Sequence, residues 1–153
     1  MRTVVLMAVL LPLSLTPAQV RASSQDTKTI DKQSIEALEA RASQAQPREQ
    51  CFLYAKLVHQ MTELSLKQYA AGDIESAHGL LKRIQQLAQK IHLSVTNNDK
   101  RLKNAEILLN QTAFRLNEML NASNYEDRPL LLETLAEVNH AQNETMMQVF
   151  HNK

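Results

Sequence analysis

Apolar residues recur at intervals of three and four along most of this 153-residue chain, which is the spacing of a helix face that packs on a core. The most regular stripe comprises Ile74, Ala77, Leu81, Ile84, Ala88, Ile91 and Val95. Such spacing, sustained over several turns, is typical of helices in left-handed bundles. The pattern therefore predicts an amphipathic helix over residues 74–95.

Four further segments carry stripes of the same kind and predict helices over residues 31–46, 48–71, 100–122 and from Pro129 to about residue 149. The residues expected to face inward are, in chain order, Ile35, Leu38, Ala42 and Ala45; Tyr54, Leu57, Met61, Leu64, Gln68 and Ala71; Leu102, Ala105, Leu109, Thr112, Leu116 and Met119; and Leu131, Leu135, Val138, Gln142, Met146 and Val149. The first stripe has only two large residues, so its helix should be the least firmly docked.

Turn-forming residues separate these segments. Pro47 ends the first helix, and Gly72 followed by Asp73 is typical of a C-cap and the next N-cap, which predicts a hairpin there. The segment 96–99 (TNND) has the composition of a turn, but it contains neither Gly nor Pro. A long continuous helix through it is therefore left open.

Composition narrows the fold class. The chain has two Gly, four Pro and no Trp, and it is rich in good helix formers. So few turn formers cannot supply the many tight turns of a β-sandwich or a Gly-rich phosphate loop. We therefore expect an all-α fold, namely an antiparallel helical bundle of four main helices plus a weaker N-terminal helix. A single domain is expected over residues 23–153, with 23–47 loosely docked and 48–153 forming the bundle.

Residues 1–22 have the composition of a cleavable signal peptide. Arg2 gives a positive start, residues 3–15 are apolar and uncharged, and Val20 and Ala22 are the small residues expected before a cleavage after Ala22. The apolar run is too short for a spanning helix. We therefore expect a periplasmic or secreted protein without a membrane span in its mature chain.

Charge bears on the class of partner. The chain has 17 Lys and Arg against 16 Asp and Glu, so no strong attraction to nucleic acid is expected. Six basic residues should gather near the end of the third and fourth helices: Lys82, Arg83, Lys90, Lys100, Arg101 and Lys103. Because no aromatic residues are interleaved with them, we interpret this cluster as a solvated face.

Two Glu-x-x-His spacings invite comparison with di-iron bundles, which use two such motifs and two further glutamates. The residues concerned are Glu75 with His78, Glu137 with His140, and the additional Glu63 and Glu118. The helix phase argues against a cluster, because the apolar stripes direct Glu75, Glu137 and His140 toward solvent. We therefore expect no metal ligand and no cofactor.

Cys51 is the one cysteine, so an intrachain disulfide is excluded. It could be a semi-buried apolar residue, a partner in an intermolecular disulfide, or a haem ligand together with His151. As a nucleophile it would need a nearby base, and His59 lies roughly 12 Å away along the same helix. No catalytic residue is expected, and the chain is not predicted to be an enzyme.

A second apolar line distinguishes this chain from a simple four-helix pattern. Phe52, His59 and Leu66 recur every seven residues opposite the main stripe of their helix, and Ile107 and Phe114 do so on theirs. A helix that is apolar on two faces is buried on two sides. The N-terminal helix can cover one of these lines, and the other would be left for a partner chain, a ligand groove or a fold with more layers than four helices. The candidate interaction surface comprises Cys51, Phe52, His59, Leu66, Ile107 and Phe114.

The chain is similar in its pattern of residues to small exported helical-bundle proteins of unknown function from Gram-negative bacteria. The segments that carry this resemblance are YAAGDIESAHGLLKRIQQLAQK, KRLKNAEILLNQTAFRLNEML and RPLLLETLAEVNH. This resemblance spans residues 51–150 and implies a location in the bacterial envelope. It carries no catalytic motif, so it assigns no functional residue.

Together these observations favour an exported, non-enzymatic interaction or structural module that binds a second copy of itself or another protein. The alternative is a haem- or metal-binding helical bundle of the periplasm.

Overall fold

The structure is a computed structural model that describes residues 30–95 and 101–151. Over this part of the chain every element is a helix, which confirms the predicted all-α class. The elements are α1 (Lys32–Gln44), α2 (Pro47–Ala70), α3 (Ile74–Ser94), α4 (Leu102–Ala122) and α5 (Arg128–His151). The expected signal peptide and the 96–99 turn lie outside the described residues.

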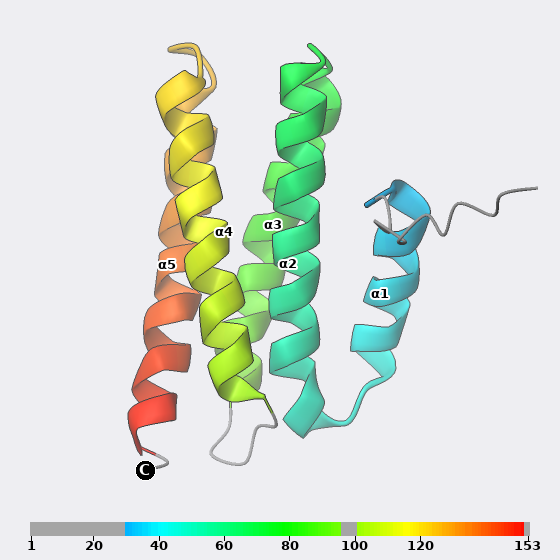
Figure 1. Ribbon diagram of the computed structural model, residues 1–153, viewed down its shortest axis with the longest axis vertical. Coiled ribbons are helices and arrows are strands. Elements are labelled where there is room, and N and C mark those ends of the chain that lie inside the picture. The colour runs from blue at the N-terminus through cyan, green and yellow to red at the C-terminus, as the bar shows by residue number, and fades with distance from the viewer. Residues whose placement is uncertain (1–29, 96–100, 152–153) are drawn as a thin grey trace, which may run out of the picture.

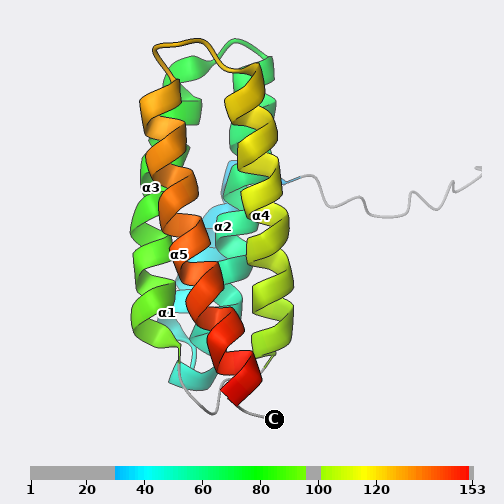
Figure 2. The same cartoon turned by 90° about the vertical axis from the view of Figure 1, so that its left-hand side faces the viewer.

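Helices α2, α3, α5 and α4 pack in a ring in that order, and α1 lies against α2 (Figure 1). The colours in Figures 1 and 2 show that α2 and α4 run in one direction and α3 and α5 in the other. Two antiparallel hairpins, α2–α3 and α4–α5, thus pack side by side. Within the described residues α3 and α4 lie diagonally across the ring, so their side chains meet only in the core and their backbones are not neighbours. The neighbours α2 and α4 consequently run parallel and form one outer face.

Local sequence signals set the helix ends. Asp31 accepts a hydrogen bond from the Ser34 backbone N–H and caps α1, while Asp73 caps α3 through the Ser76 N–H. Gly72, between α2 and α3, has a φ of 81°, a left-handed conformation that glycine adopts without strain. These signals agree with the predicted hairpin.

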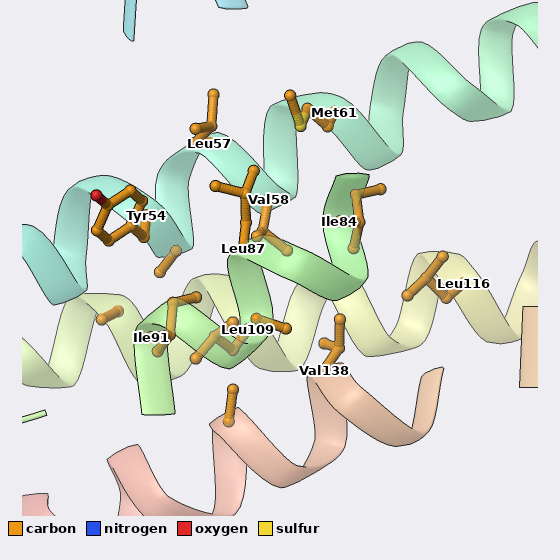
Figure 3. Close-up of a cluster of buried hydrophobic side chains, with 14 of the residues drawn as sticks. Tyr54, Leu57, Val58, Met61, Ile84, Leu87, Ile91, Leu109, Leu116 and Val138 are labelled. Atoms are coloured by element: carbon orange, nitrogen blue, oxygen red, sulfur yellow. The ribbon is translucent and has the colours of Figure 1, made fainter. Parts of the chain in front are cut away.

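The core forms where the four apolar stripes meet. Figure 3 shows Val58 of α2 beside Leu87 of α3, with Leu109 and Leu116 of α4 and Val138 of α5 in the same core. In α4 every residue predicted to face inward is buried. The predicted inward stripe of α4 is therefore confirmed without exception.

The predicted inward stripe of α5 is partly wrong. Met146 is 37% exposed, whereas the buried residues are Leu131, Thr134, Val138, Ala141 and Thr145. The threonines can be buried because the Thr134 hydroxyl donates to the Leu130 carbonyl and that of Thr145 to the Ala141 carbonyl. Because these hydroxyls are hydrogen-bonded within the helix, the face of α5 that carries the threonines can be buried in place of the predicted apolar stripe.

The upper half of α2 departs from its predicted stripe in the same way. Ala71 is exposed, while Thr62 and Ser65 are fully buried. The Thr62 hydroxyl donates to the Val58 carbonyl and the Ser65 hydroxyl to the Ala77 carbonyl of α3.

None of the helices in the described residues is long and apolar enough to cross a membrane.

Candidate functional site

The outer face shared by α2 and α4 carries most of the predicted interaction surface. Because the two helices lie side by side (Figure 1), their second apolar lines flank one seam. A shallow hollow in this seam is lined by His59, Asn110, Gln111, Phe114 and Arg115. Phe114 is 63% exposed and Ile107 is 43% exposed. These two residues are large apolar groups that the fold leaves in contact with water.

The other predicted surface residues are less accessible. Phe52 and Leu66 are half-buried, and the Arg101 guanidinium lies over the Phe52 ring at 5.0 Å from its centroid. Cys51 has no exposed surface, so its thiol is part of the core and is not offered to a surface partner. The open part of the surface is therefore on α4.

His59 links α2 to α4 from within the seam. The Thr112 hydroxyl donates to the Leu108 carbonyl at 2.7 Å, so its oxygen accepts from His59 Nδ1 at 3.2 Å. This arrangement places the proton of neutral His59 on Nδ1 and leaves Nε2 as an acceptor. Burial lowers the pKa of His59 below its usual 6.5; nearby Glu63 opposes this shift and Arg115 adds to it.

This lowered pKa predicts a pH-dependent stability. The unfolded chain takes up a proton at His59 more readily than the folded one, so the free energy of unfolding should fall as pH drops below 6.5. In His59→Gln this contribution is lost. Urea unfolding at neutral and mildly acidic pH should therefore show a larger acid-induced loss for the unaltered protein. Equal losses in both proteins would contradict the burial of a neutral imidazole.

Arg115 ties the two helices together beside the hollow. Its guanidinium donates to both carboxylate oxygens of Glu63 on α2, at 2.7 and 3.1 Å, and to Glu118 one turn along α4. These hydrogen bonds, first to Glu63 and then to Glu118, raise the pKa of Arg115. The rim of the hollow beside Phe114 therefore carries one cation held between two carboxylates.

The residues of the apparent di-iron motifs are not brought together. Glu63 and Glu118 both bind Arg115, and Glu75 is exposed. His78 binds Asp127, whereas His140 lies near Glu144 on its own helix. The sequence spacing of these motifs therefore corresponds to separate local contacts.

Asp127 forms a buried polar junction at one end of the bundle. Its two carboxylate oxygens accept from the Tyr69 hydroxyl of α2 at 2.7 Å and from His78 Nε2 of α3 at 2.8 Å. Burial, followed by the hydrogen bond to Asp127, raises the pKa of Tyr69. Because Asp127 is 7% exposed and directly precedes α5, it connects three helices. We assign it a structural role.

The predicted basic cluster is divided among separate contacts. Arg83 pairs with Glu39 of α1, the Lys90 ammonium lies 5.8 Å from the centre of the Tyr54 ring, and Arg101 covers Phe52. Lys82 and Lys103 are exposed, and Lys100 lies outside the described residues. The cluster therefore does not form one basic patch over the described residues.

Besides the Asp127 junction, sequence reasoning missed a polar cluster formed by His92 of α3 with His140 and Glu144 of α5. The spacing of His140, Glu144 and His151, four and seven residues apart, places them on one face of α5 and could have drawn attention to it. His92 could not have been added from sequence, because its proximity depends on the packing of α3 against α5.

Comparisons with known proteins gave no matching family model, no similar curated protein and no similar solved structure.

Proposed function

We propose that this chain is an exported, non-enzymatic helical module that acts by binding protein, and that its first partner is a second copy of itself. The single observation that supports this best is the exposure of Phe114 and Ile107, one heptad apart on α4. An exposed apolar line on a helix whose other side is fully packed is typical of a protein contact. Export follows from the signal-peptide composition of residues 1–22.

The outer stripe of α4 favours a copy of itself as the occupant because its central part carries no charge. The exposed residues on this stripe are Lys103, Ile107, Asn110, Phe114, Asn117 and Asn121. Lys103 is the one charged member, and it lies at the N-terminal end. Two such stripes can therefore approach without like charges meeting at the centre.

The flanking charges are also complementary to those of a second copy. If two α4 helices pack antiparallel about an axis between Asn110 and Gln111, Ile107 lies opposite Phe114 of the second copy. The same register places Lys103 opposite Glu118 of the second copy. A two-fold axis repeats each pairing, so the same surface patch on both copies supplies both sides of the contact. This pattern of apolar and opposite-charge pairs supports an isologous dimer.

The frame that presents this stripe is, in our proposal, an antiparallel arrangement of four main helices, α2–α5, with α1 as the weaker addition. The contacts of α1 with the rest of the ring centre on α2, on a different side from α4. This leaves the α4 stripe open.

The alternative, a haem held by Cys51 and His151, has less support because Cys51 is fully buried and His151 is exposed.

Charge reversal tests the proposed register. Lys103→Glu should weaken dimerisation by about tenfold or less, because it places like charges opposite each other twice in an exposed setting. Glu118→Lys should do the same, and the double variant Lys103→Glu/Glu118→Lys should recover most of the lost affinity. Sedimentation equilibrium measures these dissociation constants.

Glu75→Lys is the matched control, since Glu75 is exposed on α3 and lies outside the stripe. It should leave the dissociation constant unchanged. A double variant no tighter than the two single ones would contradict this register, and a monomer in all variants and in the unaltered protein would contradict the dimer itself.

A further inference from the structure

Two histidines and a glutamate from different helices converge where α3 and α5 lie side by side, on a face separate from the α4 stripe (Figure 2). His92 belongs to the last turn of α3, and His140 and Glu144 are one turn apart on α5. One ligand atom from each of the three residues lies within 4.8 Å of the other two. Two imidazole nitrogens and a carboxylate thus lie close together at the surface.

The distances in this cluster are close to those of a metal site. His140 Nε2 lies 3.9 Å from one oxygen of Glu144, and the other oxygen accepts from His92 Nδ1. The two imidazole rings have centroids 5.0 Å apart and are tilted by 51°. Ligand atoms about 2.1 Å from one ion are separated by roughly 3–3.5 Å in tetrahedral geometry. Small side-chain rotations are therefore enough to bring all three onto one ion.

The cluster is open to solvent and has room for a further ligand. The side chains of His92 and His140 are 44% and 60% exposed, so an ion in solution can reach them. Beside them is a hollow lined by His92, Val95, Glu144, Met147, Gln148 and His151. His151 lies seven residues beyond Glu144 and eleven beyond His140, roughly 16 Å along α5 from the latter, so it is too far away to bind the same ion. Water from this open side would complete the coordination.

The backbone adds a favourable field for a cation. His92 lies in the last turn of α3, whose C-terminal end carries partial negative charge, whereas Glu144 and His140 lie two and three turns before the end of α5. Mg²⁺ and Ca²⁺ favour oxygen ligands, so a site with two imidazoles does not suit them. Two imidazoles with one carboxylate suit Zn²⁺ or Cu²⁺.

We propose that His92, His140 and Glu144 bind one late transition-metal ion of the Zn²⁺ or Cu²⁺ class, with water completing the coordination. Bound there, the ion links α3 to α5 and stabilises the folded state, since it binds that state preferentially. This site shares no residue with the α4 stripe, so it stands independently of the proposed dimer.

Isothermal titration of the metal-stripped protein with Zn²⁺, and separately with Cu²⁺, tests the site. One ion per chain is expected, with Cu²⁺ bound more tightly than Zn²⁺. His92→Gln, His140→Gln and Glu144→Gln should each weaken binding at least tenfold. Glu75→Gln removes the same charge as Glu144→Gln at a distant exposed position and should leave the affinity unchanged.

A second measurement reads the ligands directly. In an imidazole ¹⁵N spectrum, Zn²⁺ should shift the signals of two of the five histidines, namely His92 and His140, and leave His59, His78 and His151 in place. Shifts of all five, binding of several weak ions per chain, or equal losses in Glu144→Gln and Glu75→Gln would overturn the proposal.

Discussion

Replacing Asp127 with alanine should lower the free energy of unfolding by about 3 kcal/mol, because buried partners of a carboxylate would be left without their acceptor. Asp127 is 7% exposed and accepts hydrogen bonds from Tyr69 and His78. Its loss therefore loosens α2, α3 and the start of α5 together. Urea unfolding followed by circular dichroism, at fixed protein concentration, measures the change.

Three variants separate this junction from a general loss of charge. Asp127→Asn keeps one acceptor oxygen and should cost less than Asp127→Ala. Tyr69→Phe removes the hydrogen bond that the hydroxyl donates to Asp127 and the one that it accepts from the Asn124 N–H, and should cost about 1–2 kcal/mol. Glu126→Ala removes the neighbouring exposed carboxylate and should change stability by less than about 0.5 kcal/mol. If Asp127→Ala were no more destabilising than Glu126→Ala, the junction would not have the structural role assigned to it.

The second large effect is expected for Phe114→Asp, which should abolish dimerisation at accessible protein concentrations. In the proposed register Phe114 meets Ile107 of the second copy twice, so one substitution removes two apolar contacts. It also places two carboxylates in the contact, where burying an unpaired charge costs several kcal/mol. The fold should be retained, because Phe114 is 63% exposed in the chain itself.

Leu132→Asp is the matched control for this prediction. Leu132 is 52% exposed on α5 and lies outside the α4 stripe, so its substitution should leave the dissociation constant unchanged. Light scattering at several concentrations, with circular dichroism to verify folding, distinguishes the variants. Equal dissociation constants for Phe114→Asp and the unaltered protein would show that Phe114 is not part of the interface.

The fold was predictable where apolar side chains alone decide which face is buried. Helix α4 is the best example, because Leu102, Leu109, Leu116 and their partners in the stripe are all buried as expected. In α5 the prediction failed because Thr134 and Thr145 satisfy their own hydroxyls on the preceding turn and can be buried. A pattern based on apolarity cannot anticipate polar groups that need no external partner.

The candidate sites were predictable to the extent that they lie on a single helix. Ile107 and Phe114 were identified by their seven-residue spacing and are indeed exposed. Asp127 and His92 were not singled out, because the partners of each lie about 50 residues away in the chain. Such contacts depend on which helices become neighbours, and the parallel pairs α2–α4 and α3–α5 are set by the packing of two hairpins.

Sedimentation equilibrium of the unaltered protein over a wide concentration range tests the central proposal most directly. The proposed pairing of α4 stripes predicts a reversible monomer–dimer equilibrium, with the mass of two chains at high concentration and no larger species, because an isologous contact closes on itself. A single-chain mass at every concentration, or continued growth beyond two chains, would contradict it.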